Sequence, residues 1–330
     1  MPSPLTLQLD NINTNTPSAA AELTATSTSD KNLLAVYSPL AVGILGPSLL
    51  ICLLTGAGWL FLLRRHRSFA GKARFLLLVC TTLSHTSYFG VTLLRFLLLL
   101  CGVAISQPLC ACLLLLQNYS LFVELVTLDA LCLDRYLAVC RPLSYESIFS
   151  QENVYKVLLV VFLIPLVPPV SLALLHVLDG KDGSIALLCN VDSLDTNPFL
   201  MYWRVTMNLV YFLPSLAAIS FFYVLVLWQG LPSRPAVPSG PQAQKVLLLH
   251  LIQLGFYLLP ILPIIVLSPL QSRGLVGERA VFWIKNVLFV FFTIGQVMGP
   301  IVHGLRSEEI RRCITRHLGW RRGTVVPLSI

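Results

Sequence analysis

The sequence predicts an all-α membrane protein: a bundle of seven transmembrane helices with a short amphipathic helix at its C-terminal end. Of the 330 residues, 56% are hydrophobic and 12% are charged, and the mean hydropathy is +0.78. Proteins of the aqueous phase carry about 25% charged residues, so this composition with long apolar runs indicates several membrane spans. The runs 73–83 and 157–175 do not alternate in polarity, which favours helices over a β-barrel.

The chain divides into three parts. Residues 1–34 are polar and lack the apolar core of a signal peptide, and we expect a disordered extracellular segment there. Residues 35–304 are expected to form the seven-span domain, and residues 305–330 an amphipathic helix and a cytoplasmic tail. The expected membrane spans are 35–63, 73–100, 108–138, 154–178, 202–229, 244–268 and 280–304.

Prolines predict bends in the last four spans. Each proline inside a helix removes one backbone hydrogen bond and distorts the preceding turn. The residues concerned are Pro165, Pro168, Pro169, Pro214, Pro260 and Pro300.

The segment after the last span has an amphipathic pattern. Ile310, Ile314 and Leu318 follow one another at intervals of four and share a helix face, while the arginines of this segment lie off that face. We therefore expect a short helix on the inner leaflet, with membrane lipids as its partner. Cys313 is a candidate for S-acylation there, and an unmodified thiol is the alternative.

The distribution of Lys and Arg predicts the orientation in the membrane. The 23 basic residues divide into sixteen on one side, six on the other and Arg95 inside the second span. Because cytoplasmic loops carry the excess of basic residues, we expect a multi-pass plasma-membrane protein with its N-terminus outside and its C-terminus in the cytoplasm. The formal net charge of +8 then belongs to the cytoplasmic face and does not indicate nucleic-acid binding.

Two motifs stand at the cytoplasmic ends of the third and seventh spans. Residues 134–145 read DRYLAVCRPLSY and resemble the odorant-receptor pattern DRYxAxCxPLxY, and residues 299–310 read GPIVHGLRSEEI and resemble NPxxYxLRxxEI. Lys245 and His250 match part of a third pattern, KAxxTCxxH. On these motifs the chain resembles the rhodopsin-like (class A) G-protein-coupled receptors. Within that class it is similar to odorant receptors, fish-type ones among them, and to a neighbouring group of orphan receptors.

The resemblance implies that Asp134, Arg135 and Tyr136 act in activation and in contact with a heterotrimeric G protein. Arg135 cannot lose its proton, so it needs an acidic or backbone partner at the helix end, and Asp134 is expected to hold it in the resting state. An activating ligand would favour a state in which this contact opens. The alternative is an arginine that only extends to the membrane interface.

The activation relay of the family is altered in this chain. Gly299 and His303 stand where the family motif has Asn and Tyr around Pro300, and His85 stands where the second helix of the family has an Asp that helps to bind sodium. A receptor fold whose signalling is lost or atypical is therefore an alternative function.

His85 and Glu124 are predicted to form a polar pair inside the membrane. In the family, the position of Glu124 faces the same cavity as that of His85. An imidazolium beside a carboxylate would neutralise both charges without a cation, so we hypothesise that the pair replaces the sodium site. The alternative is a neutral His85 that is hydrogen-bonded to the backbone or to Ser84.

The resemblance also implies a disulfide between Cys110, at the outer start of the third span, and Cys189, in the loop between the fourth and fifth spans. An oxidising exterior permits such a bond, which would hold the loop over the bundle. Two free thiols are the alternative.

The ligand pocket of the family lies between the outer halves of helices three, five, six and seven. Amine receptors carry an Asp where this chain has Gln117, so a simple cationic amine is disfavoured, and a small, partly apolar molecule is expected. Lys285 is either a partner for an anionic ligand or an anchor at the membrane interface. The candidate pocket residues are Gln117, Asn118, Leu121, Phe122, Asn208, Tyr211, Tyr257, Leu258 and Lys285.

The leading hypothesis is a receptor that couples an extracellular small molecule, an odorant among the candidates, to a heterotrimeric G protein. A multi-span transporter or channel is the alternative from another class, although no internal repeat and no charged path across the membrane is evident. An enzyme is not expected, because HExxH, GxSxG and phosphate-loop motifs are missing from the sequence. We likewise expect no cofactor and no metal site.

Overall fold

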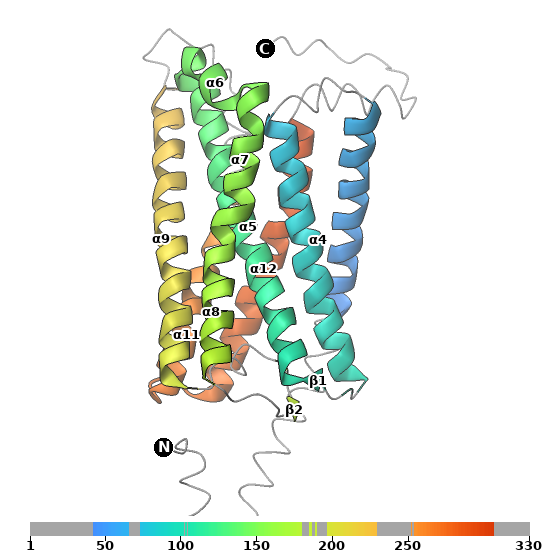
Figure 1. The fold of residues 1–330 in the computed structure, drawn as a ribbon, viewed down its shortest axis with the longest axis vertical. Coiled ribbons are helices and arrows are strands. Elements are labelled where there is room, and N and C mark those ends of the chain that lie inside the picture. Colours follow the sequence, from blue (N-terminus) through green and yellow to red (C-terminus); the bar gives the residue numbers. More distant parts are fainter. Residues whose placement is uncertain are drawn as a thin grey trace, which may run out of the picture.

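The computed structural model describes residues 42–65, 73–101, 103, 105–179, 185–186, 189, 197–229, 252 and 254–306. Within this part of the chain, seven helices are long and apolar enough to cross a membrane, and they stand side by side in one bundle (Figure 1). The predicted all-α seven-helix membrane bundle is therefore confirmed. The spans are Val42–Arg65, Ala73–Leu100, Gln107–Ala138, Glu152–Leu178, Pro198–Val226, Leu254–Gln271 and Arg279–Gly299.

The labels of Figure 1 follow the chain and begin after the first span. The labelled elements are α4 (Ala73–Leu100), β1 (Ile105–Ser106), α5 (Gln107–Cys140), α6 (Pro142–Phe149), α7 (Gln151–Leu163), η1 (Ile164–Leu166), α8 (Val167–Leu178), β2 (Ile185–Ala186), α9 (Pro198–Gln229), α11 (Ile261–Ser272) and α12 (Glu278–Arg306).

Several expected limits differ from the observed ones. The fifth span begins at Pro198 instead of 202, and the sixth ends at Ser272 instead of 268. The expected N-terminal segment 1–34 lies outside the described residues. So do Lys245, His250 and the tail from 307 onward, which includes Cys313.

Prolines shape the fourth and sixth spans as predicted. In the fourth span, Pro165 lies in the 3₁₀ turn η1, and two further prolines follow in the first turn of α8, where their missing N–H groups need no partner inside the helix. In the sixth span, Pro260 lies at a turn immediately before α11. Pro214 lies inside α9.

Three short elements were not predicted: one helix and two strands. The connection after the third span contains the helix α6, which starts with a proline in its first turn, a position where the ring already has helical geometry. Ser150 then caps α7, because its hydroxyl oxygen accepts a hydrogen bond from the backbone N–H of Asn153 at 3.3 Å. At the other end of the bundle, β1 and β2 form a two-stranded antiparallel ladder with Ile105 opposite Ala186.

The interior and the outer surface of the bundle are both apolar. Helix α5 packs against α4, α7, α8 and α9, and its core side chains include Val123 and Leu128. The outer surface carries large exposed apolar side chains, including Leu54 at 65%, Phe221 at 59% and Trp283 at 58%. Apolar side chains on the outer surface of such a bundle are what a lipid environment favours.

Candidate functional site

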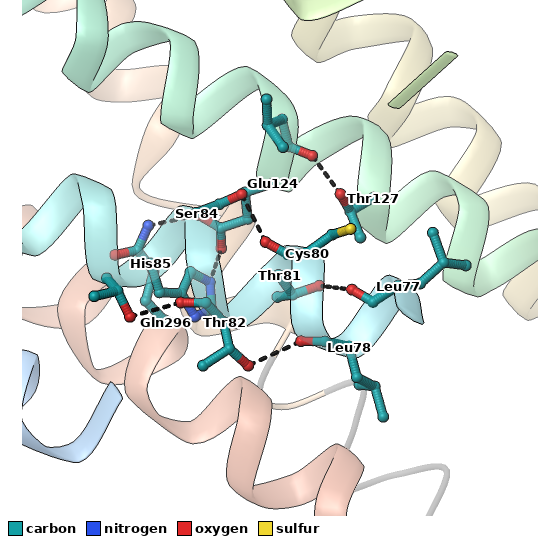
Figure 2. A network of polar contacts seen from close by, with 12 residues as sticks. Leu77, Leu78, Cys80, Thr81, Thr82, Ser84, His85, Glu124, Thr127 and Gln296 are labelled. Atoms are coloured by element: carbon teal, nitrogen blue, oxygen red, sulfur yellow. Dashed lines mark hydrogen bonds and ion pairs between the residues drawn. The ribbon is translucent and has the colours of Figure 1, made fainter. Parts of the chain in front are cut away.

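A polar cluster lies at the centre of the bundle, where α4, α5 and α12 meet. Nε2 of His85 lies 2.5 Å from Oε1 of Glu124, and Nε2 of Gln296 donates a hydrogen bond of 2.7 Å to Oε2 of the same carboxyl group. Figure 2 shows the three side chains converging from these three helices. All three are at most 2% exposed, so the polar groups depend on one another instead of on water.

The neighbouring hydroxyl groups are occupied within their own helix. The hydroxyls of Thr81, Thr82 and Ser84 donate to carbonyl groups one turn earlier in α4, at 2.8 to 3.0 Å (Figure 2). Ser84 is thus bonded to the carbonyl of Cys80, while His85 contacts Glu124. The structure brings the two predicted side chains together, and among the described residues His85 makes no hydrogen bond to Ser84 or to the backbone.

The sequence did not predict Gln296 as a member of this cluster. Because Gln296 donates to one carboxyl oxygen and His85 contacts the other, both oxygens of Glu124 have a protein partner. A cation bound at this carboxyl group would have to share the two oxygens with these partners. The replacement of a sodium site by this pair stays a prediction.

The Asp-Arg-Tyr motif lies at the opposite end of α5 from Cys110. Asp134 is 3% exposed and accepts a hydrogen bond of 2.9 Å from the hydroxyl of Tyr145 in α6. Burial raises the pKa of Tyr145 to about 12, and the negative charge of Asp134 acts in the same direction, while Arg74 and Arg135 oppose it. Tyr145 was not predicted as the partner of Asp134, and the contact between Asp134 and Arg135 stays a prediction.

Two further motif residues lie in the same region. The ring of Tyr136 lies 5.4 Å from that of Phe222, which connects the end of α5 to α9. Pro300 and His303 lie in the last two turns of α12.

The Cys110 end of the bundle is held by a covalent bond and a short ladder. Cys110 and Cys189 form the predicted disulfide, with their Cα atoms 5.5 Å apart and 79 residues between them in sequence. The ladder of β1 and β2 joins the same two regions of the chain. The segment after α8 is thereby fixed against the start of α5, as expected from the family resemblance.

Arg95 of α4 lies at this same end, and the sequence alone predicts no partner for it. Its Nη1 donates to Oε1 of Gln117 at 2.5 Å, and its Nη2 donates to the backbone carbonyl of Cys189. Arg95 thus links the predicted pocket residue Gln117 to the disulfide-bonded segment. The signal that could have identified it is the presence of a charged residue inside a membrane span.

The other predicted pocket residues are found on the expected helices. The rings of Phe122 and Tyr211 lie 5.0 Å apart, and the hydroxyl of Tyr211 donates to the carbonyl of Ile164. The ring of Tyr257 stacks on that of Phe292 at 5.2 Å. Phe122, Tyr257 and Leu258 are buried, and the half-buried members are Asn118, Leu121, Asn208, Tyr211 and Lys285.

A second polar contact joins α5 and α9. The hydroxyl of Ser215 donates a hydrogen bond of 2.6 Å to Oδ2 of Asp129. The sequence alone does not identify Ser215 as the partner of this acid. Ser215 directly follows Pro214. A proline inside a helix has no N–H group to donate to the carbonyl four residues earlier, so the helix is weakened one turn before it.

The bundle, the motif at one end and the disulfide at the other define a seven-helix membrane receptor. Residues 76–303 match the model of the 7 transmembrane receptor (rhodopsin family). This match covers more than half of the chain, and the chain belongs to that family.

Individual relatives include receptors with different ligands. The chain is similar to "Olfactory receptor 2AG2" from Homo sapiens, with 26% identity over 56% of this chain and 59% of the relative. It is also similar to "Odorant receptor 131-2" from Danio rerio, with 23% identity over 56% and 57%. A shorter match, to "Sphingosine 1-phosphate receptor 2" from Mus musculus, has 31% identity over 33% of this chain and 31% of the relative. The chain thus spans less than two thirds of the length of these relatives.

Proposed function

We propose that this protein is a plasma-membrane receptor that transmits the binding of an extracellular small molecule to a heterotrimeric G protein. Its N-terminus is extracellular, and the end of the bundle that carries Asp134, Arg135 and Tyr136 is cytoplasmic. An odorant is one candidate class of ligand. The family relationship supports a receptor, and the excess of basic residues on the Asp134 side supports the orientation.

The observation that carries the proposal is the position of the Asp-Arg-Tyr motif. It lies at the end of α5 remote from the Cys110–Cys189 disulfide, and Asp134 is already engaged by Tyr145. Opening of such a contact is a local change that a bound G protein can stabilise at the cytoplasmic face.

The proposal is tested by nucleotide exchange. The full-length protein in nanodiscs is mixed with a promiscuous G protein, and exchange is measured alone and with a panel of odorants and small metabolites. We expect wild-type exchange above the background of empty nanodiscs, and loss of that excess in Arg135→Ala. The matched control is Arg141→Ala, which removes an exposed arginine six residues further along the same segment.

Three outcomes contradict the proposal. Exchange that Arg135→Ala leaves unchanged would indicate that the motif does not engage the G protein. Absence of any exchange would favour a receptor fold without this signalling, given the substitutions at Gly299 and His303. Flux of a solute through liposomes without G protein would favour the transporter or channel.

The orientation is tested separately. An epitope at the N-terminus of the receptor should bind antibody on intact cells, while an epitope at the C-terminus should bind only after permeabilisation. The reverse pattern would overturn the assignment of the two faces.

A further inference from the structure

A guanidinium group lies inside the bundle with neutral partners. Arg95 is half-buried in the last two turns of α4, within a membrane span. The two acceptors that it contacts are the amide oxygen of Gln117 and the carbonyl oxygen of Cys189. Its Nε is buried and has no hydrogen-bond partner among the described residues.

The charge of Arg95 is not neutralised within the described part of the chain. No carboxylate of the described residues lies within 4.0 Å of the nitrogen atoms of Arg95. The ion pair that the structure shows inside the spans joins His85 and Glu124 instead. Glu124 has both oxygens occupied, and Asp129 is bonded to Ser215. Neutral oxygens solvate a guanidinium but leave its full positive charge in a region of low dielectric constant, which is costly.

The position of Arg95 in the bundle indicates what kind of group its charge can attract. The side chain lies at the end of the bundle where the disulfide holds the segment after α8, and it contacts that segment directly. Gln117, its other partner, is one of the pocket residues that the family resemblance implies. The positive charge also repels a protonated amine, which agrees with the expectation that amine ligands are disfavoured.

We propose that Arg95 binds the carboxylate of an anionic small-molecule ligand. The inference rests on the proposed function, because it names the chemical class of the ligand for the same receptor. A guanidinium presents its N–H groups as a planar fork that matches a carboxylate, so the ligand supplies the negative charge that Gln117 and Cys189 lack. Lys285, for which the sequence leaves open an anionic ligand or an anchoring role at the membrane interface, is a separate group on α12.

The test measures binding without any G protein. The purified full-length receptor in nanodiscs is heated with butyrate, octanoate, benzoate or phenylacetate, and with the methyl ester of each acid as its uncharged counterpart. We expect at least one acid to raise the melting temperature and to bind about 30-fold or more tightly than its ester, because loss of one partner of a desolvated charge pair costs at least about 2 kcal/mol.

Variants of Arg95 assign the effect to this residue. Arg95→Gln keeps a hydrogen-bond donor but removes the charge, and we expect it to weaken binding of the acid about 30-fold or more. Arg95→Lys keeps the charge without the planar fork and should retain part of the binding. Arg279→Gln, which removes an exposed arginine from the first turn of α12, should bind the acid like the wild type.

The proposal is overturned if no acid stabilises the receptor, if esters bind as well as acids, or if the acid still stabilises Arg95→Gln to the wild-type extent. Stabilisation by alkyl phosphates alone would overturn the assignment to a carboxylate. A wild-type melting temperature of Arg95→Gln without ligand shows that the variant is folded. Acid binding without any nucleotide exchange would contradict the proposed function and leave the assignment of Arg95 intact.

Discussion

His85 and Glu124 share a contact of 2.5 Å between two helices at the centre of a membrane bundle, with both side chains at most 2% exposed. The pair has no net charge as an imidazolium beside a carboxylate. It also has none as a neutral imidazole beside a protonated carboxyl group. Two ionisable residues can therefore lie at membrane depth without a bound ion. Gln296 completes the arrangement by donating to the second carboxyl oxygen, so α12 is joined to α4 and α5 through one side chain.

Removal of one member of this pair should destabilise the receptor. Glu124→Leu leaves the polar groups of His85 and Gln296 without their common acceptor, and His85→Leu leaves the carboxyl group with one donor. We expect each substitution to lower the free energy of unfolding by about 3 kcal/mol, because a buried charged or polar partner remains.

The double variant distinguishes a coupled pair from two separate residues. Glu124→Leu combined with His85→Leu should lose less than the sum of the single losses, by about 1 kcal/mol or more. Denaturant unfolding of the purified receptor provides the four values. Ser84→Ala is the control, since its hydroxyl bonds within α4, and strictly additive losses would show that the two residues are not coupled.

Sodium should have no specific effect on this receptor. Both oxygens of Glu124 have protein partners. The family resemblance implies that His85 stands where the family has the Asp of its sodium site. We expect equal melting temperatures and equal ligand-free nucleotide exchange in NaCl and in the same concentration of N-methylglucamine chloride. His85→Asp restores a second carboxylate and should create a dependence on sodium. A wild-type receptor that sodium stabilises or inhibits would contradict the replacement of the site.

Long apolar runs predicted the bundle, and the family resemblance implied the disulfide and the His85–Glu124 pair. Long apolar runs permit few folds in a membrane, and the family pattern places both pairs at positions that meet. Gln296 and Arg95 were missed as parts of these sites, because a single polar residue in a span does not reveal which helix it faces. Both are polar residues within an apolar membrane span, and that property alone could have marked them as candidates.

Short elements were harder to predict. Helix α6 has no long apolar repeat, and β1 pairs with β2 across a separation of about eighty residues, which no local pattern of two residues can indicate. The contact of Tyr145 with Asp134 depends on α6, so it could not be predicted without that helix.

The hydrogen bond from Tyr145 to Asp134 should stabilise the end of the bundle that carries the Asp-Arg-Tyr motif. Tyr145→Phe removes the donor from a carboxyl group that is 3% exposed, and we expect a loss of about 1–3 kcal/mol in the free energy of unfolding. Tyr155→Phe, at a tyrosine that is 75% exposed on α7, is the matched control and should change stability little. Equal unfolding midpoints for Tyr145→Phe and the wild type would show that this hydrogen bond does not stabilise the fold.

The pH dependence of the same contact follows from the pKa of Tyr145. The pKa is raised from 10.0 to about 12, so the folded state retains the phenolic proton to a higher pH than the unfolded chain does. The stabilisation is therefore complete below about pH 10 and declines as the pH rises from about 10 to 12. We expect the difference in stability between the wild type and Tyr145→Phe to be constant below this window and to shrink within it. A difference that changes already near neutral pH would point to another titrating group.

The close approach of α12 to the sixth span depends on Gly295. A Cβ atom at this position would lie 2.7 Å from the backbone nitrogen of Tyr257 and 2.9 Å from the carbonyl carbon of Phe256, and backbone atoms cannot turn aside as a flexible side chain can. Gly295→Ala must therefore push the two helices apart, and we expect a loss of about 1–3 kcal/mol in the free energy of unfolding.

Gly90→Ala in α4 is the matched control, because nothing lies within 4 Å of its added Cβ. There the gain in helix propensity, up to about 1 kcal/mol, should leave the receptor as stable as the wild type or more so. Thermal unfolding of both variants measures the difference in their stability. A Gly295→Ala receptor as stable as Gly90→Ala would show that a methyl group fits between α12 and the sixth span.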